Sequence, residues 1–339
     1  MRHLSFLFFL ISFALLSGCS SESSKQHEQK FSIPKLGSVS LELNVKSEKR
    51  LDTVVVSLFA SENGVYTTHD FDGYNELLEL TSTLSNTKTK KYGDSSIFIE
   101  DESGKDIINI LGDYKGKFFF NYIKSSASYT WIRHDISRTS ANYTGWHIFK
   151  DKMIVFDRTM PLQVYQYPSF ELIKEYKLPG VNRPTNYKHV VSGNYFHLSV
   201  DRRNVHKVID LDTGRVVRDG PILGLKSGIK SIGLIKKDDE VFVFFKEGVF
   251  AQLDERGNLK RLGKVDIDVE SLAHVGQCLA IGSTDGHLAF IPDDLSSLLI
   301  TSKIHDGWVS HVTADENGNG YSAGIDKRVL SWSVPEACL

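Results

Sequence analysis

The chain has 339 residues, enough for one large domain or two ordinary ones, and 41% of them are hydrophobic, which favours a folded core over general disorder. Its 40 Lys and Arg against 42 Asp and Glu leave a formal charge of −2, which excludes the basic excess typical of nucleic-acid-binding proteins. With 26 Gly, 13 Tyr and 20 Phe but only 8 Pro and 3 Met, the composition predicts an all-β fold with many turns.

The N-terminus has the pattern of a secretory signal. Arg2 and His3 precede the uncharged residues 4–16, a run shorter than the about 20 residues that a membrane-spanning helix needs. This run leads into Leu16-Ser17-Gly18-Cys19, which resembles the lipobox of bacterial lipoproteins. The resemblance implies that the signal peptide 1–18 is removed and that Cys19 is lipidated, with palmitate as a typical acyl chain. The alternative is an ordinary signal peptide that contains a cysteine.

The same resemblance implies a location. In lipoproteins a residue such as Ser20 directly after the lipidated cysteine is typical of the outer membrane of Gram-negative bacteria. We therefore expect a lipid anchor in that membrane and a chain that faces the periplasm. Residues 19–30 are polar and without apolar periodicity, as in a flexible tether, so the folded domain is predicted over residues 31–339.

Short apolar runs joined by tight polar turns recur along the mature chain, and we find eight strand-rich segments: 54–80, 96–111, 118–133, 153–176, 195–217, 241–262, 278–299 and 320–334. From residue 153 onward, Leu162, Val205, Gly248 and Gly286 occupy comparable places about 40 residues apart. That period is typical of the four-stranded blades of a β-propeller. A domain of this length predicts about seven blades, with six to eight left open.

The most specific motif lies in the final unit. His305 precedes one predicted strand, Ser322 lies on the next, Asp326 follows it at a turn, and Trp332 lies on a third. This spacing resembles a WD-repeat blade. The resemblance implies a buried chain of hydrogen bonds in which Asp orients His, His bonds Ser, and Ser meets the indole N–H. These residues are expected to hold the blade together, and no other unit carries the full set.

The chain ends too soon after Trp332 to supply a fourth strand for this blade, and a missing outer strand would leave an exposed edge. Residues 38–45 alternate polar and apolar side chains without a fault, which is the pattern of a half-buried strand. We therefore expect this N-terminal segment to complete the last blade and to close the ring.

Patterns that could indicate chemistry have simpler explanations. Residues 320–324 (GYSAG) match the nucleophile elbow of serine hydrolases, but no His follows Ser322 and the next segment predicts a strand rather than a helix. Residues 315–326 match much of a calcium-binding loop, but a hairpin turn favours the same Asp, Asn and Gly. The histidines lack zinc-site spacing. We expect no catalytic residue, no metal and no cofactor.

For two further groups of residues the sequence is compatible with two interpretations each. Cys278 and Cys338 could form a disulfide in an oxidising periplasm, although Cys278 lies in an apolar run and fits equally well as a small buried hydrophobe. The aromatic residues of segment 121–147 lie among Ser, Thr and Arg, a mixture enriched at protein interfaces but also compatible with blade interiors. Its interface candidates are Tyr129, Trp131, Tyr143 and Trp146.

These observations favour an outer-membrane lipoprotein with a single monomeric propeller that acts as a non-enzymatic protein-binding or assembly scaffold. Its partners would be the membrane, through the lipid anchor, and a periplasmic or outer-membrane protein that the sequence does not identify. The alternative is a periplasmic propeller enzyme, lactonase-like or sugar-active, with a site at the central channel. A polysaccharide-binding or peptidoglycan-binding module is a third interpretation.

Overall fold

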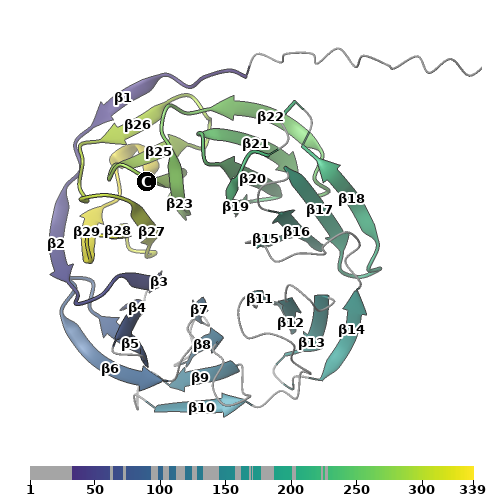
Figure 1. The fold of residues 1–339 in the computed structure, drawn as a ribbon, viewed down its shortest axis with the longest axis horizontal. Helices are drawn as coiled ribbons and strands as arrows, with labels where there is room; N and C mark the ends of the chain where they lie inside the picture. The colour runs from purple at the N-terminus through teal and green to yellow at the C-terminus, as the bar shows by residue number, and fades with distance from the viewer. Residues whose placement is uncertain are drawn as a thin grey trace, which may run out of the picture. The chain divides into compact units, whose positions relative to one another are not determined.

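Strand pairing organises the chain into seven small sheets, as the computed structural model shows (Figure 1). The structure describes residues 33–339 except 62–63, 72–73, 93–97, 102–106, 112–118, 124–127, 133–144, 157–161, 168, 170, 177–186, 201–203, 223 and 226–227. For residues 69–75, 155–156, 187 and 200 and for the strands between 86 and 149 it describes the backbone and no side chains. Residues 33–339 form one compact unit.

The sheets are numbered here by their place along the chain. The first contains β3 (Val55–Ser61), β4 (Gly64–Phe71), β5 (Tyr74–Leu80) and β6 (Asn86–Tyr92), and the second β7 (Phe98–Asp101), β8 (Ile107–Leu111), β9 (Phe119–Ile123) and β10 (Ser128–Ile132). The third contains β11 (Gly145–Phe149), β12 (Lys152–Phe156), β13 (Leu162–Gln166) and β14 (Leu172–Tyr176), and the fourth β15 (Tyr187–Ser192), β16 (Tyr195–Val200), β17 (Val205–Asp210) and β18 (Val216–Pro221).

The last three sheets follow the same plan with two additions from the N-terminus. The fifth contains β19 (Ser231–Lys237), β20 (Glu240–Phe245), β21 (Val249–Asp254) and β22 (Leu259–Lys264). The sixth contains β23 (Val269–Val275), β24 (Cys278–Ser283), β25 (Leu288–Pro292) and β26 (Leu298–Thr301), with β1 (Ser38–Leu41) as a fifth strand. The seventh contains β27 (Val309–Ala314), β28 (Asn319–Gly324) and β29 (Arg328–Ser333), with β2 (Val45–Arg50) as its fourth strand.

No α-helix occurs in the described part of the chain; its one helical element is the 3-10 turn η1 (Glu336–Cys338). Among those residues no helix has the length and apolar character needed to cross a membrane. The prediction of an all-β fold is confirmed.

The hydrophobic core lies between neighbouring sheets. One cluster joins Phe242 and Phe250 of the fifth sheet to Ile281 of the sixth, and Phe290 of the sixth sheet packs edge-on against Trp332 of the seventh at 5.5 Å between ring centroids. A further cluster joins the first sheet to the seventh, with residues Val55, Leu58, Ala60, Val65, Leu78, Leu80, Tyr321, Ala323 and Val329 among its members. The first and last sheets are therefore packed against each other, although they lie at opposite ends of the chain.

The eight predicted strand-rich segments become seven sheets, because 96–111 and 118–133 supply the two halves of one sheet, β7 to β10. Five of the predicted segments begin one strand late and omit the first strand of their sheet, β11, β15, β19, β23 or β27. Leu162 and Val205 begin the third strand of their sheets, Gly248 directly precedes it, and Gly286 lies two residues before it, so these positions are equivalent to within two residues. The period of about 40 residues is therefore a period of sheets.

The N-terminal segment differs from its prediction. Residues 38–41 form β1, which pairs in parallel with β26 of the sixth sheet, and the strand that completes the seventh sheet is β2, paired with β29. The alternation over residues 38–45 correctly indicated a strand. This strand pairs with β26, which is short and uncharged, because the N-terminal segment reaches the sixth sheet before the seventh. The following residues, Val45–Arg50, are mostly charged, so their alternation gave no signal; pairing with β29 makes them a strand.

Candidate protein-interaction surface

The loops at one end of the seventh sheet are held by a buried network of hydrogen bonds. His305 lies in the loop before β27, Ser322 on β28, and Asp326 in the turn between β28 and β29. The His305 Nε2 lies 2.9 Å from the Ser322 hydroxyl, and its Nδ1 lies 3.1 Å from Asp326 Oδ1. A carboxylate only accepts hydrogen bonds, so Nδ1 carries the proton and donates it, and Nε2 accepts from the hydroxyl.

Asp326 is the centre of this network. The backbone N–H of Asp306 donates to its Oδ2 at 2.9 Å, and the Arg328 Nε donates to the same oxygen at 2.8 Å. Burial works to raise the pKa of Asp326, but the hydrogen bond from Asp306, the nearby His305 and the Arg328 guanidinium outweigh it and lower the pKa to about 2. Burial lowers the pKa of His305 despite the carboxylate, so the pair is a neutral imidazole beside an ionised acid at pH 7.

Trp332 stands apart from this network, contrary to the expected bond between Ser322 and the indole. Its Nε1 is buried and has no hydrogen-bond partner among the described residues. The register of β28 and β29 explains the difference, because it places Trp332 opposite Gly320 and places Ser322 opposite Leu330. The indole lies directly over Gly320, where a Cβ would come within 2.0 Å of the ring. Trp332 therefore stabilises the blade through packing.

The arrangement of Ser322, His305 and Asp326 has the order of partners found in a Ser-His-Asp catalytic triad. Both Ser322 and His305 are fully buried, with no surface open to solvent. A substrate carbonyl therefore has no access to the hydroxyl, and the hydrogen bonds hold two strands and two loops together. The structure gives this G-x-S-x-G sequence a structural role.

The calcium-loop pattern also forms a turn. The Oδ1 of Asp315 accepts hydrogen bonds from the backbone N–H groups of Asn317 and Asn319, each at 2.9 Å, and its Oδ2 accepts from the Asn319 side chain. The Lys46 ammonium donates to the Asn319 Oδ1 at 2.6 Å, so a cationic side chain already meets this oxygen. In the described part of the chain, no group of three or more His, Cys, Asp or Glu side chains is placed to hold a metal ion.

The network places two large apolar side chains in solvent. Trp308 follows the loop of His305, and Ile325 precedes Asp326; they are 47% and 43% exposed. Their loops are joined directly, since the Ile325 N–H donates to the Trp308 carbonyl at 3.0 Å. We call these two residues the Trp308 surface. An aromatic side chain that is exposed on a rigid loop is typical of the anchors that dominate protein interfaces, because little conformational entropy is lost on binding.

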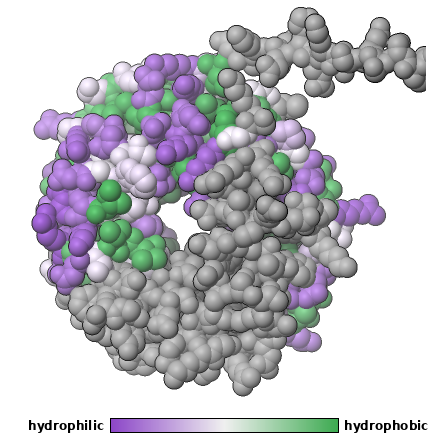
Figure 2. All heavy atoms as spheres, in the orientation of Figure 1, coloured by the Kyte–Doolittle hydropathy of each residue, from purple (hydrophilic) through white to green (hydrophobic). Residues whose placement is uncertain are grey.

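On the face that Figure 2 shows, the apolar residues of the described part occur in small groups among polar ones. The remaining exposed large hydrophobics include Leu172 and Ile173 on β14 and Val216 and Val217 on β18, which are outer strands. Sequence reasoning did not single out Trp308, although a Trp beside the His of the motif was a usable signal.

The other predicted site residues have different outcomes. Cys278 and Cys338 are joined in a disulfide, which ties η1 at the C-terminus to β24 of the sixth sheet. Tyr129 and Trp131 lie on β10 and Trp146 on β11, but their side chains lie outside the description, as does the whole of Tyr143. Cys19 and the predicted signal and tether also lie outside the described residues.

Comparison with solved structures decides the fold. The WD40 β-propeller domain of Doa1 superposes with a TM-score of 0.67 at 13% sequence identity, over 87% of this chain and 98% of that one. The fold is that of a WD40-like β-propeller. The computationally designed Ika8 protein matches with a TM-score of 0.62 at 13% identity, over 86% of this chain and all of that one. No protein-family model matches the chain, and neither does any curated protein sequence.

Proposed function

We propose that this protein is a lipid-anchored, non-enzymatic scaffold that binds a protein partner through the Trp308 surface of its propeller. A propeller of this kind suits a protein-interaction scaffold in general, because its loops present rigid surfaces. The observation that carries the proposal is the exposure of Trp308 and Ile325 on two loops that a buried ionic network holds in place.

The proposed architecture is one closed ring of seven blades. Three observations support it: seven sheets of similar size, the pairing of β2 with β29, and the cluster of buried residues shared by the first and seventh sheets. A closed ring has no unpaired end sheet, so it would present its loops with little internal motion.

The proposed location is the periplasmic face of the outer membrane, with the anchor on Cys19. The lipobox-like residues 16–19 and Ser20 support it. The disulfide between Cys278 and Cys338 supports it independently, because structural disulfides persist in oxidising compartments such as the periplasm. Labelling of cells with a palmitate analogue tests the anchor: the full chain should become labelled, and Cys19→Ser should abolish the label.

Crosslinking in intact cells followed by identification of the captured protein tests the binding role. Trp308→Ala should lower the yield of the captured partner at least tenfold, since interface hot spots typically contribute 2 kcal/mol or more. Leu172→Ala is the matched control, because Leu172 is also a large apolar residue, 46% exposed, on an outer strand of another sheet. Both variants should unfold at the same urea concentration as the unaltered chain.

An unchanged yield from Trp308→Ala would refute the assignment of the surface. The aromatic segment offers a second location for it, so Trp131→Ala and Trp146→Ala belong in the same experiment. Loss of the partner from either of these variants, with stability retained, would move the interface to that segment. If no protein is captured by any form of the chain, the scaffold role itself is wrong.

A further inference from the structure

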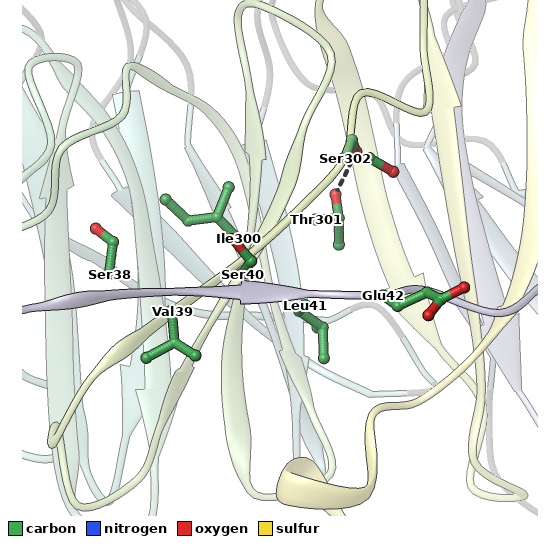
Figure 3. A pocket seen from close by; sticks show the side chains of 8 residues that line it. All are labelled: Ser38, Val39, Ser40, Leu41, Glu42, Ile300, Thr301 and Ser302. Carbon is green, nitrogen blue, oxygen red and sulfur yellow. Dashed lines mark hydrogen bonds between the residues drawn. The ribbon is translucent and has the colours of Figure 1, made fainter.

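The N-terminal segment follows the outer strands of three sheets in succession. Lys35 forms a parallel bridge with Lys264 at the end of β22, β1 then pairs with β26, and β2 pairs with β29 (Figure 1). In the middle of this path β1 is an edge strand, since it is the end member of a five-stranded sheet. A groove of about 500 Å³ runs along it and is lined by Ser38, Val39, Ser40, Leu41, Glu42, Ile300, Thr301 and Ser302 (Figure 3).

The free edge of β1 carries unpaired backbone groups. The Leu298 N–H donates to the Gly37 carbonyl at 2.8 Å, and in a parallel pair alternate residues turn their N–H and C=O to the same neighbour. Gly37, Val39 and Leu41 therefore face β26. The N–H and C=O groups of Ser38, Ser40 and Glu42 face away from the sheet, and strand pairing within the described chain supplies no partner for them.

Most of the other outer strands are protected, and β1 is not. Five outer strands contain charged residues and carry a β-bulge at their second residue, a combination that discourages edge-to-edge pairing. These second residues are Lys46 in β2, Thr87 in β6, Ile173 in β14, Val217 in β18 and Lys260 in β22. The sequence of β1, SVSL, has no charge, and its register with β26 is continuous; β10, SYTWI, is the other such outer strand.

The side chains of β1 also alternate by face. Figure 3 shows Val39 and Leu41 on one side of the strand and Ser38 and Ile300 on the other. Val39 is 53% exposed although it is apolar. A strand added at this edge would therefore meet an apolar row on one face and a row of hydroxyls on the other.

We infer that the edge of β1 pairs with β1 of a second copy of this chain, in antiparallel orientation about a twofold axis at Ser40. The sequence from Ser38 to Glu42 is self-complementary in this register. Ser40 of each copy faces Ser40 of the other, Ser38 faces Glu42, and Val39 faces Leu41. No like charges oppose each other, and all three outward residues find backbone partners. The two edges become the centre of one continuous sheet, an isologous interface.

The strand pair alone is small. A stable interface of standard size buries about 800 Å² on each partner, more than five paired residues cover. We therefore expect a dimer that dissociates readily in solution and is populated where copies are concentrated, as on a shared membrane surface.

Thiol crosslinking tests the register in membranes of cells that express the full chain. Residues that exchange both backbone hydrogen bonds in an antiparallel pair lie about 5.5 Å apart at Cα. Ser40→Cys, treated with a short bifunctional thiol reagent, should give at least ten times more product of twice the chain mass than Ile173→Cys. Ile173 is the matched control because it is 48% exposed on another outer strand.

A second pair of variants tests the backbone groups. Ser40→Pro removes an outward N–H and leaves the inward bonds of Val39 and Leu41 to β26 intact. It should raise the dimer dissociation constant of the detergent-solubilised chain at least tenfold, whereas Ser40→Ala should leave it unchanged. The inference fails if Ser40→Cys crosslinks no better than Ile173→Cys, if the product contains a different protein, or if Ser40→Pro dimerises as before.

Discussion

Replacement of Asp326 by alanine should destabilise the protein more than most single substitutions. The carboxylate accepts hydrogen bonds from His305, Asp306 and Arg328. Without it the buried Nδ1–H of His305 loses its acceptor, at a cost of about 1–3 kcal/mol. Arg328 keeps its ion pair with Glu48 but loses the shorter one with Asp326, which adds to this cost, so the total destabilisation should reach about 3–5 kcal/mol.

Asp326→Asn is the informative companion. It keeps one oxygen that accepts from His305 but loses the charge that Arg328 meets, so about half of the destabilisation should remain. Urea unfolding followed by circular dichroism at pH 7 measures both variants. Equal unfolding midpoints for Asp326→Ala and the unaltered chain would refute the assignment of the network as a main support of the seventh sheet.

The pH dependence of the same experiment is an internal check. The pKa of Asp326 is about 2 in the folded protein, below its ordinary value of 3.8, so the folded state favours the ionised acid. The stabilisation is therefore fully present above about pH 4 and is lost as the pH falls toward about 2. The difference in free energy of unfolding between the unaltered chain and Asp326→Asn should therefore become smaller over that range. A difference that stays constant would contradict the ionic role of Asp326.

Three further predictions concern packing, crosslinking and acid stability. Gly320→Ala should lower the free energy of unfolding by about 1–3 kcal/mol, because the new methyl group would clash with the Trp332 ring. Gly37→Ala is the control: an added Cβ there has no atom within 4 Å, so this variant should unfold in urea like the unaltered chain. Cys338→Ser should lower the free energy of unfolding by about 4 kcal/mol, since the disulfide closes a loop with a sequence separation of 60 residues. A reducing agent should lower the unfolding midpoint of the unaltered chain to that of the variant and leave the midpoint of the variant unchanged. Burial lowers the pKa of His197 from 6.5 to about 4, so the folded state binds fewer protons than the unfolded state in this range. Between about pH 6.5 and pH 4, the free energy of unfolding of the unaltered chain should therefore fall by about 2–3 kcal/mol more than that of His197→Gln. Equal decreases would contradict the lowered pKa of His197.

Local spacing made part of this structure predictable. The separation of His305, Ser322 and Asp326 is set by one loop, one strand and one turn, so the sequence was sufficient to bring them together. The position of Trp332 required the register of two strands, and a shift of two residues separated its indole from Ser322. The number of sheets was predictable from the period, since each unit of about 40 residues forms one sheet.

Long-range pairing was the part that local patterns could not provide. The strand Val45–Arg50 has four charged residues in six, and its local sequence does not predict a strand. It is a strand because it pairs with β29. The choice between a disulfide and a buried thiol for Cys278 depended on where Cys338 lies, which in turn depends on how the sixth and seventh sheets pack together. The exposure of Trp308 is likewise a property of the assembled loops.

The pairing of β2 with β29 also imposes an order of events on synthesis. Glu48 on β2 and Arg328 on β29, which form an ion pair, lie 280 residues apart. At synthesis rates of about 5–20 residues per second, β2 waits roughly 15–60 seconds before its partner exists. β1 and β2 are therefore the first strands made and among the last to pair. Until their partners exist, the nascent chain must keep them away from other strands. A truncated chain that ends before β29 would leave β2 without its partner strand, whereas β1 can pair as soon as β26 has been made.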